Sequence, residues 1–236
     1  MNVIVPNRLK ELTLGQYQHF QKLEGDDDFL GRKMVEIFCN IKMEVIKQMK
    51  VASITKINET LLKAFSERPE FQMTFKMEGV EYGFIPNLDE LTFGELHDIE
   101  TTIGDWQKMN ETMAVLYRPI IQKMGSRYRI KDYDADALRA ELMRKMPLDI
   151  VMGSMVFFCD LGMDLSKTFL KSLAKEKEIN SAAKDNLQDD GAGFPYSILL
   201  LKEMLPDLMK FPGLMLPSPS PTSPSKKTKQ KPKIKS

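Results

Sequence analysis

Apolar residues recur at helical spacing through the N-terminal part of the chain. The spacing predicts helices over residues 12–24, about 28–50 and 54–66, and Pro69 then ends the helical pattern. In the helix over 54–66 the apolar residues lie on one face, which is typical of an amphipathic helix.

Between residues 71 and 84 the pattern changes to alternation of apolar and polar residues, which is typical of strands. Glu78-Gly79 interrupts the alternation and suits a tight turn. The sequence therefore predicts a β-hairpin, which needs helices or a third strand to be stable. Residues 127–131 supply a candidate third strand, because apolar and basic residues alternate there.

Helical spacing returns after the hairpin. Pro119 ends the first of these helices, and Pro147 suits the first turn of a later one. From Pro212 onward proline, serine and lysine dominate, and such a segment buries too little apolar surface to fold. The predicted helices cover about 106–117, 134–145, 147–159, 164–177 and 195–210.

One helix-start signal occurs twice, 79 positions apart. Residues 11–17 read Glu-Leu-Thr-Leu-Gly-Gln-Tyr, and residues 90–96 read Glu-Leu-Thr-Phe-Gly-Glu-Leu. In each copy the threonine suits the N-cap, and the residue three positions later can return its hydrogen bond, which makes a capping box. Internal duplication and chance similarity of helix caps both explain the match. The two boxes are Thr13 with Gln16 and Thr92 with Glu95.

These elements predict a mainly α protein of the α+β class. We expect a helical domain built from two related capped helix pairs, with an inserted β-hairpin and a disordered C-terminal tail rich in Lys, Pro and Ser. The expected parts are an N-terminal helical unit (1–68), the hairpin with the second helical unit (69–178), a loop with an amphipathic C-terminal helix (179–214) and the tail (215–236).

Charge is distributed unevenly along the chain. The net charge is +1, but without the six lysines of the tail it becomes −5. A mildly acidic body lacks the basic face of a specific nucleic-acid reader, so we expect the tail to act through solubility or weak electrostatic docking. The tail lysines are Lys226, Lys227, Lys229, Lys231, Lys233 and Lys235.

The sequence also indicates the kind of cellular compartment in which the protein is expected. No apolar stretch approaches the roughly 20 residues that a membrane-spanning helix needs, and the start of the chain carries no apolar signal core. The two cysteines, Cys39 and Cys159, both lie in apolar helical contexts. We expect free thiols in a reducing compartment, with a disulfide as the alternative.

Signals for catalysis and metal binding are sparse. The sequence has no phosphate-binding Gly-rich loop and no cysteine pair at metal spacing, and its two histidines, His19 and His97, lie on separate predicted helices. The acidic residues at 26–28 and within 132–136 suit either a cation or the start of a helix, and their spacing favours the helix start. We therefore expect no catalytic residue, no cofactor and no metal.

If the chain binds a partner, aromatic residues, Arg and Met are the side chains that most often anchor such an interface. These types gather at the exit of the hairpin, after it, and again in the predicted C-terminal helix. The alternative for the aromatic residues is a place in the core. The candidate partner-binding residues are Tyr82, Phe84, Ile85, Pro86, Trp106, Tyr117, Arg118, Met204 and Leu208.

Three stretches of the chain carry a family resemblance. Residues 79–95 read Gly-Val-Glu-Tyr-Gly-Phe-Ile-Pro-Asn-Leu-Asp-Glu-Leu-Thr-Phe-Gly-Glu, residues 113–120 read Met-Ala-Val-Leu-Tyr-Arg-Pro-Ile, and residues 146–149 read Met-Pro-Leu-Asp. Together they resemble small proteins encoded among the structural genes of tailed bacteriophages. The resemblance implies a virion component or an assembly factor such as a tail-assembly chaperone. It implies another viral structural protein as the partner, in the host cytoplasm or the virion, and no catalytic residue.

Two other functions are compatible with the sequence. One is a nucleic-acid accessory protein that uses the basic tail, whose binding would weaken steeply with salt. The other is an enzyme in which carboxylates and Tyr82, Tyr117 or Tyr128 perform acid–base chemistry, and it requires a deep pocket with converging polar groups. An assembly factor requires an exposed groove or apolar patch instead.

Overall fold

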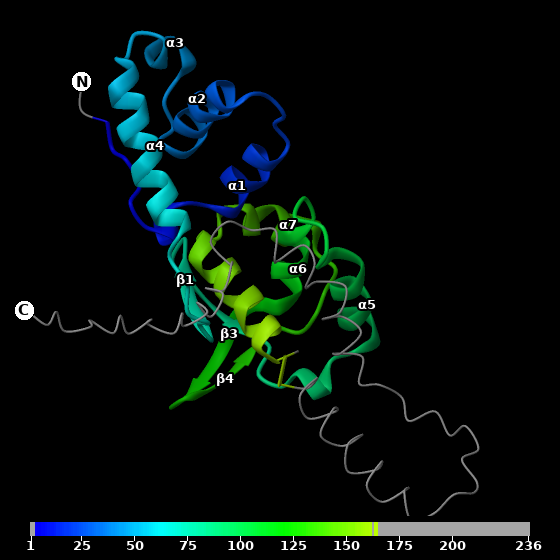
Figure 1. Cartoon of the computed structure of the whole chain (residues 1–236). Helices are drawn as coiled ribbons and strands as arrows, with labels where there is room; N and C mark the ends of the chain where they lie inside the picture. The colour runs from blue at the N-terminus through cyan, green and yellow to red at the C-terminus, as the bar shows by residue number, and fades with distance from the viewer. Residues whose placement is uncertain (1–2, 162, 165–236) are drawn as a thin grey trace, which may run out of the picture.

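Helices and a four-stranded antiparallel sheet make up the computed structural model, which describes residues 3–161 and 163–164 (Figure 1). The predicted α+β class, mainly helical, is confirmed. The α-helices are α1 (Leu14–Gln21), α2 (Asp27–Phe38), α3 (Met43–Ile46), α4 (Val51–Phe65), α5 (Phe93–Thr102), α6 (Met109–Leu116) and α7 (Ala137–Leu142), and residues 148–161 are helical as well. Short 3-10 helices are η1 (Leu9–Glu11), η2 (Leu88–Glu90) and η3 (Met143–Lys145). The strands are β1 (Thr74–Met77), β2 (Val80–Phe84), β3 (Tyr117–Met124) and β4 (Arg127–Ile130).

The helices and the sheet occupy different ends of the molecule. Helices α2, α3 and α4 gather at one end in Figure 1, and the sheet lies toward the other end with α5 and α6. The long helix α4 leads from the helical end into β1. The strand order in the sheet follows the chain, β1-β2-β3-β4.

Both predicted capping boxes are present. The Thr13 Oγ1 accepts the N–H of Gln16 at 3.3 Å, and the Thr92 Oγ1 accepts the N–H of Glu95 at the same distance. Asp26 caps α2 by accepting the N–H of Phe29 at 2.7 Å, which confirms the interpretation of that acidic run as a helix start. The residues that precede each helix thus fix where it begins.

The predicted hairpin is confirmed as β1 and β2, and the candidate third strand is confirmed as β4. Glu78 and Gly79 have φ angles of 50° and 81°, so both turn residues are left-handed, as a two-residue turn of type I′ requires. The strand β3, which pairs with both β2 and β4, was not expected.

The helix predicted over 106–117 corresponds to α6, but it passes directly into a strand instead of stopping at Pro119. Helix α6 stops at Leu116, and Tyr117 begins β3, which runs through Pro119. Pro119 lies opposite Tyr82, and a bulge follows between Ile120 and Gln122. Proline is compatible with a strand beside such an irregularity, whereas the sequence pattern suggested only a helix stop.

The helix predicted over 28–50 is divided in two. Helix α2 ends at Phe38, and Asn40 adopts a left-handed φ of 52°. The N–H of Ile41 then donates to the C=O of Glu36 at 3.1 Å, which closes the helix end. Asparagine tolerates this conformation better than other residues with a side chain, and the chain continues as α3.

One hydrophobic core runs across the predicted boundary between residues 68 and 69. Buried side chains from α1, α2 and α4 belong to the same cluster as those from the sheet, α6 and helix 148–161. Phe71 stacks on Phe157 with ring centroids 4.3 Å apart, and the hydroxyl groups of Tyr117 and Ser154 lie 2.9 Å apart. Helix 148–161 therefore covers one face of the sheet.

Residues 12–14 pair with residues 146–148, at the start of helix 148–161. Thr13 and Pro147 form an isolated antiparallel bridge, and a backbone hydrogen bond flanks it on each side. The bridged pair exchanges no hydrogen bond of its own, so proline fits at this position. This short ladder covers the first capping box. The flanking bonds run from the Leu14 N–H to the Met146 C=O (3.0 Å) and from the Leu148 N–H to the Leu12 C=O (2.9 Å).

Some predicted elements lie outside the described residues. These are the helix over 195–210 and the tail over 215–236, together with nearly all of the helix over 164–177. Within the described part of the chain, no helix combines the length and the apolar character needed to cross a membrane.

Candidate functional site

An open groove of about 530 Å³ lies beside the start of α5. Its lining comes from three places: the exit of β2 with the start of α5, strand β3, and β4 with the loop after it. We call it the α5 groove. The residues that line it are Pro86, Glu90, Thr92, Glu95, Arg118, Tyr128, Arg129, Ile130, Lys131, Asp132 and Tyr133.

A buried ion pair lies at the α5 groove. The Arg118 Nη2 is 2.5 Å from the Glu95 Oε1, and each side chain is only 6% exposed. The second oxygen of Glu95 accepts the N–H of Thr92 at 2.7 Å and its hydroxyl at 2.8 Å. The Nε of Arg118 is buried and has no hydrogen-bond acceptor among the described residues. The second capping box is thus connected to the sheet through one arginine.

Tyr128 also lines the α5 groove, together with Arg118. Its hydroxyl donates to the C=O of Phe84 at 2.8 Å. Its ring packs on Gly83, where an added Cβ would come within 2.9 Å of the Tyr128 Cδ2 and 3.1 Å of the Ile120 Cγ1. Burial raises the pKa of Tyr128, so its phenol keeps its proton and acts as a donor.

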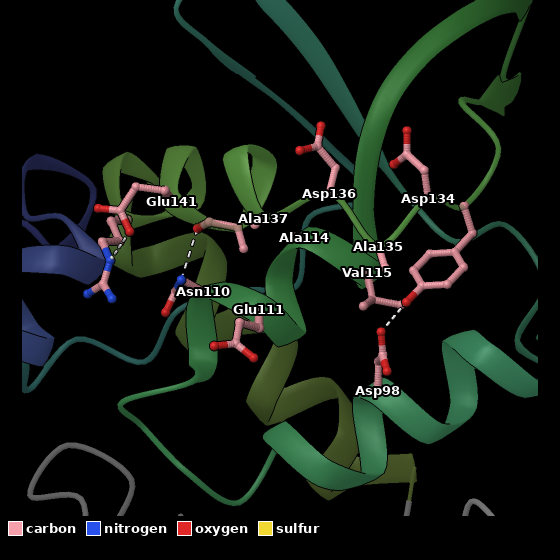
Figure 2. A pocket seen from close by; sticks show the side chains of 13 residues that line it. Asp98, Asn110, Glu111, Ala114, Val115, Asp134, Ala135, Asp136, Ala137 and Glu141 are labelled. Carbon is pink, nitrogen blue, oxygen red and sulfur yellow. Dashed lines mark hydrogen bonds and ion pairs between the residues drawn. The ribbon is translucent and has the colours of Figure 1, made fainter.

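A second cavity, of about 440 Å³, shares Tyr133 with the α5 groove (Figure 2). The Tyr133 hydroxyl donates to Asp98, which is labelled in Figure 2. Burial, followed by the hydrogen bond to Asp98, raises the pKa of Tyr133 to about 12, so this phenol also stays protonated. We call this the acidic cavity, because five carboxylates line it. They are Asp98, Glu111, Asp134, Asp136 and Glu141.

Several of these charges are paired with neighbouring cations. Asp134 accepts from Lys131 at 2.9 Å and from Arg139, and the hydrogen bond from Lys131, the largest cause, lowers the pKa of Asp134. Arg144 pairs with Glu141 at 2.8 Å. In the part of the chain that the structure describes, no three His, Cys, Asp or Glu side chains are grouped so as to hold a metal.

Four of the predicted partner-binding residues are buried in the core. Tyr82, Phe84, Ile85 and Tyr117 are each less than a tenth exposed, so the three aromatic residues take the alternative position in the core, and Ile85 lies there with them. The physical reason is the register of the sheet. Phe84 lies opposite Tyr117, and the rings pack at 5.2 Å, on the face covered by helix 148–161.

The other predicted residues have different positions. Pro86 and Arg118 line the α5 groove, so the structure brings these two together. Trp106 is partly buried against the core. Met204, Leu208 and the six lysines of the tail lie outside the described residues.

No pattern in the sequence marks Phe93 or Tyr133 as a site residue. Phe93 is 85% exposed and lies nearly parallel to the ring of His97, with centroids 6.1 Å apart. The local sequence does not predict that Phe93 is exposed, because Leu14, at the matching position of the first cap, is buried. His97 and His19 are both exposed, on α5 and α1.

Both cysteines are free thiols, as expected. Burial raises the pKa of Cys39 to about 11, and burial together with Asp160 raises that of Cys159. Because the thiolate is the reactive form, each should react with iodoacetamide about tenfold or more slowly than free cysteine near neutral pH. A mass-spectrometric time course measures this, and denaturant should restore the free rate. A thiol that reacts at the free rate in the folded chain would contradict the prediction.

Comparison with protein-family models, with curated proteins and with solved structures finds no match in any of the three. The α5 groove and the acidic cavity are therefore interpreted from their own geometry.

Proposed function

We propose that the chain is a non-catalytic, protein-binding factor in the assembly of a tailed-bacteriophage particle, in particular of its tail, or a minor component of that particle. The resemblance of residues 79–95, 113–120 and 146–149 to such proteins supports the phage setting. The partner is another viral structural protein, which the chain meets in the host cytoplasm or in the virion.

The observation that carries a binding function is the pairing of charges around Tyr133. Glu95 with Arg118 and Asp134 with Arg139 are held in ion pairs, and the phenols keep their protons. A general base needs a free acceptor close to a substrate proton. The exposed members of such pairs, Lys131 and Asp134 among them, instead present a fixed pattern of charge, which gives specificity and steers the approach of a partner with the complementary pattern.

Reversal of one charge at the rim of the α5 groove tests this function. The Lys131 side chain is 51% exposed, so Lys131→Glu should leave the fold intact and weaken partner binding about tenfold or more. The tagged full chain is recovered from infected cells, and the proteins that accompany it are identified by mass spectrometry. Lys56→Glu, at an exposed position of α4 outside the groove, is the matched control.

The outcomes separate the candidate functions. Capture of one virion structural protein by the wild type and by Lys56→Glu, but not by Lys131→Glu, supports the proposal. Equal capture by all three proteins contradicts the role of the groove. Recovery of nucleic acid alone, lost as salt increases, would overturn the proposal in favour of a tail-dependent accessory protein.

A further inference from the structure

The two copies of the helix cap differ in what covers them. Leu14, the first residue of α1, is 0% exposed, whereas Phe93, its counterpart at the start of α5, is 85% exposed. The residue before each cap shows the same difference, since Leu12 is fully buried and Leu91 only partly so. The capping boxes themselves are alike, so the difference arises from a cover that the described part of the chain supplies at the first cap and not at the second.

The cover of the first cap includes backbone hydrogen bonds. Residues 146–148 form one such bond on each side of that cap. At the second cap, the N–H of Phe93 and the C=O of Leu91 have no hydrogen-bond partner among the described residues. The α5 groove lies directly beside this cap, at Thr92. An extended segment placed there can form the same two bonds.

The sequence of the first cover identifies a matching segment. Residues 146–148 read Met-Pro-Leu, with the proline at the position that needs no N–H and an apolar side chain on each side. Of the 13 prolines in the chain, only Pro147 and Pro195 lie between two apolar side chains. Those beside Pro195 are Phe194 and Tyr196. Helical spacing follows this proline, as it follows the first one.

We infer that residues 194–196 of this chain cover the second cap, as the Met-Pro-Leu segment covers the first. In this arrangement the Phe93 N–H donates to the C=O of Phe194, and the Tyr196 N–H donates to the C=O of Leu91. The two aromatic side chains flank the proline and remove Phe93 from water, which supplies the hydrophobic part of the contact.

The connection is long enough. From Asp164, the last described residue, 29 residues lead to Phe194, and an extended chain of that length spans up to about 100 Å. The inference is independent of the proposed function, because it is tested on the isolated chain.

Amide hydrogen exchange in the full chain, followed by NMR, tests the cover. The Phe93 amide should exchange about tenfold or more slowly in the wild type than in the variant Phe194→Ser/Tyr196→Ser. The Leu14 amide, which is bonded within the described fold, serves as the internal reference and should be unchanged. Phe211→Ser, beside a proline followed by glycine, is the matched control and should keep the protection of Phe93.

A reciprocal variant completes the test. Because Phe93 is exposed in the described fold, Phe93→Ser should leave that fold intact and speed exchange of the Tyr196 amide. Equal exchange of Phe93 in the wild type and the double variant overturns the inference. Protection of Phe93 that increases with protein concentration also overturns it, since the cover would then come from a second copy.

Discussion

Glu95→Gln is expected to lower the free energy of unfolding by about 3–5 kcal/mol, because it leaves Arg118 charged and buried without a counter-ion. The glutamine keeps the size of the side chain, and its amide oxygen can still accept the N–H of Thr92. Gln16 already does this in the first capping box, where it accepts the N–H of Thr13 at 3.0 Å. The loss therefore reports the missing charge rather than the missing cap, and urea denaturation measures it.

An exposed ion pair provides the control. Glu81 pairs with Lys123 at 2.6 Å on the surface of the sheet, so Glu81→Gln should leave the urea midpoint almost unchanged. The double variant Glu95→Gln/Arg118→Met should lose less stability than the sum of its single variants, since it removes both charges together. Equal midpoints for Glu95→Gln and Glu81→Gln would show that the buried pair does not stabilise the fold.

Gly153→Ala is expected to be the second strongly destabilising change, by about 3 kcal/mol. An added Cβ would lie 2.9 Å from the carbonyl carbon of Glu70 and closer still to its oxygen. These are backbone atoms and cannot rotate away, so helix 148–161 must shift from the segment that leads into β1. The shift disturbs the stacking of Phe71 on Phe157, and urea denaturation measures the loss.

Gly104→Ala is the matched control. This glycine follows α5, its φ is not left-handed, and an added Cβ meets no heavy atom within 4 Å. Alanine there should be neutral or slightly stabilising, because it restricts the unfolded chain. Helix propensity alone predicts that Gly153→Ala stabilises the protein, so the sign of its effect decides between propensity and close packing. A stabilising Gly153→Ala would refute the close approach.

The local elements could be predicted where neighbouring residues determine them. A capping box needs a threonine and a Gln or Glu three positions later, so both boxes were found. The hairpin was found because alternation and a Glu78-Gly79 turn agree. The strand β3 was missed because its start continues the apolar pattern of α6, and its pairing with β2 is a contact between residues distant in sequence.

The candidate site depends on contacts of the same distant kind. Arg118 was identified as a binding residue from its type, and Glu95 as part of a cap, but no pattern in the sequence predicts that the two meet. The aromatic residues of β2 and β3 have the composition of an interface, and the register of the sheet places them in the core instead. Residue type suggests what a side chain can bind, whereas its exposure depends on tertiary packing.

The bridge between Thr13 and Pro147 has a consequence for synthesis on the ribosome. Thr13 emerges 134 positions ahead of Pro147, and at typical translation speeds this interval lasts on the order of ten seconds. During that time the first helices are present in the nascent chain, while the segment 146–148 that hydrogen-bonds beside the first cap has not yet been made. We expect ribosome-bound chains stalled before Pro147 to be sensitive to protease at this point and to recruit chaperones, and chains that extend well beyond it to be resistant.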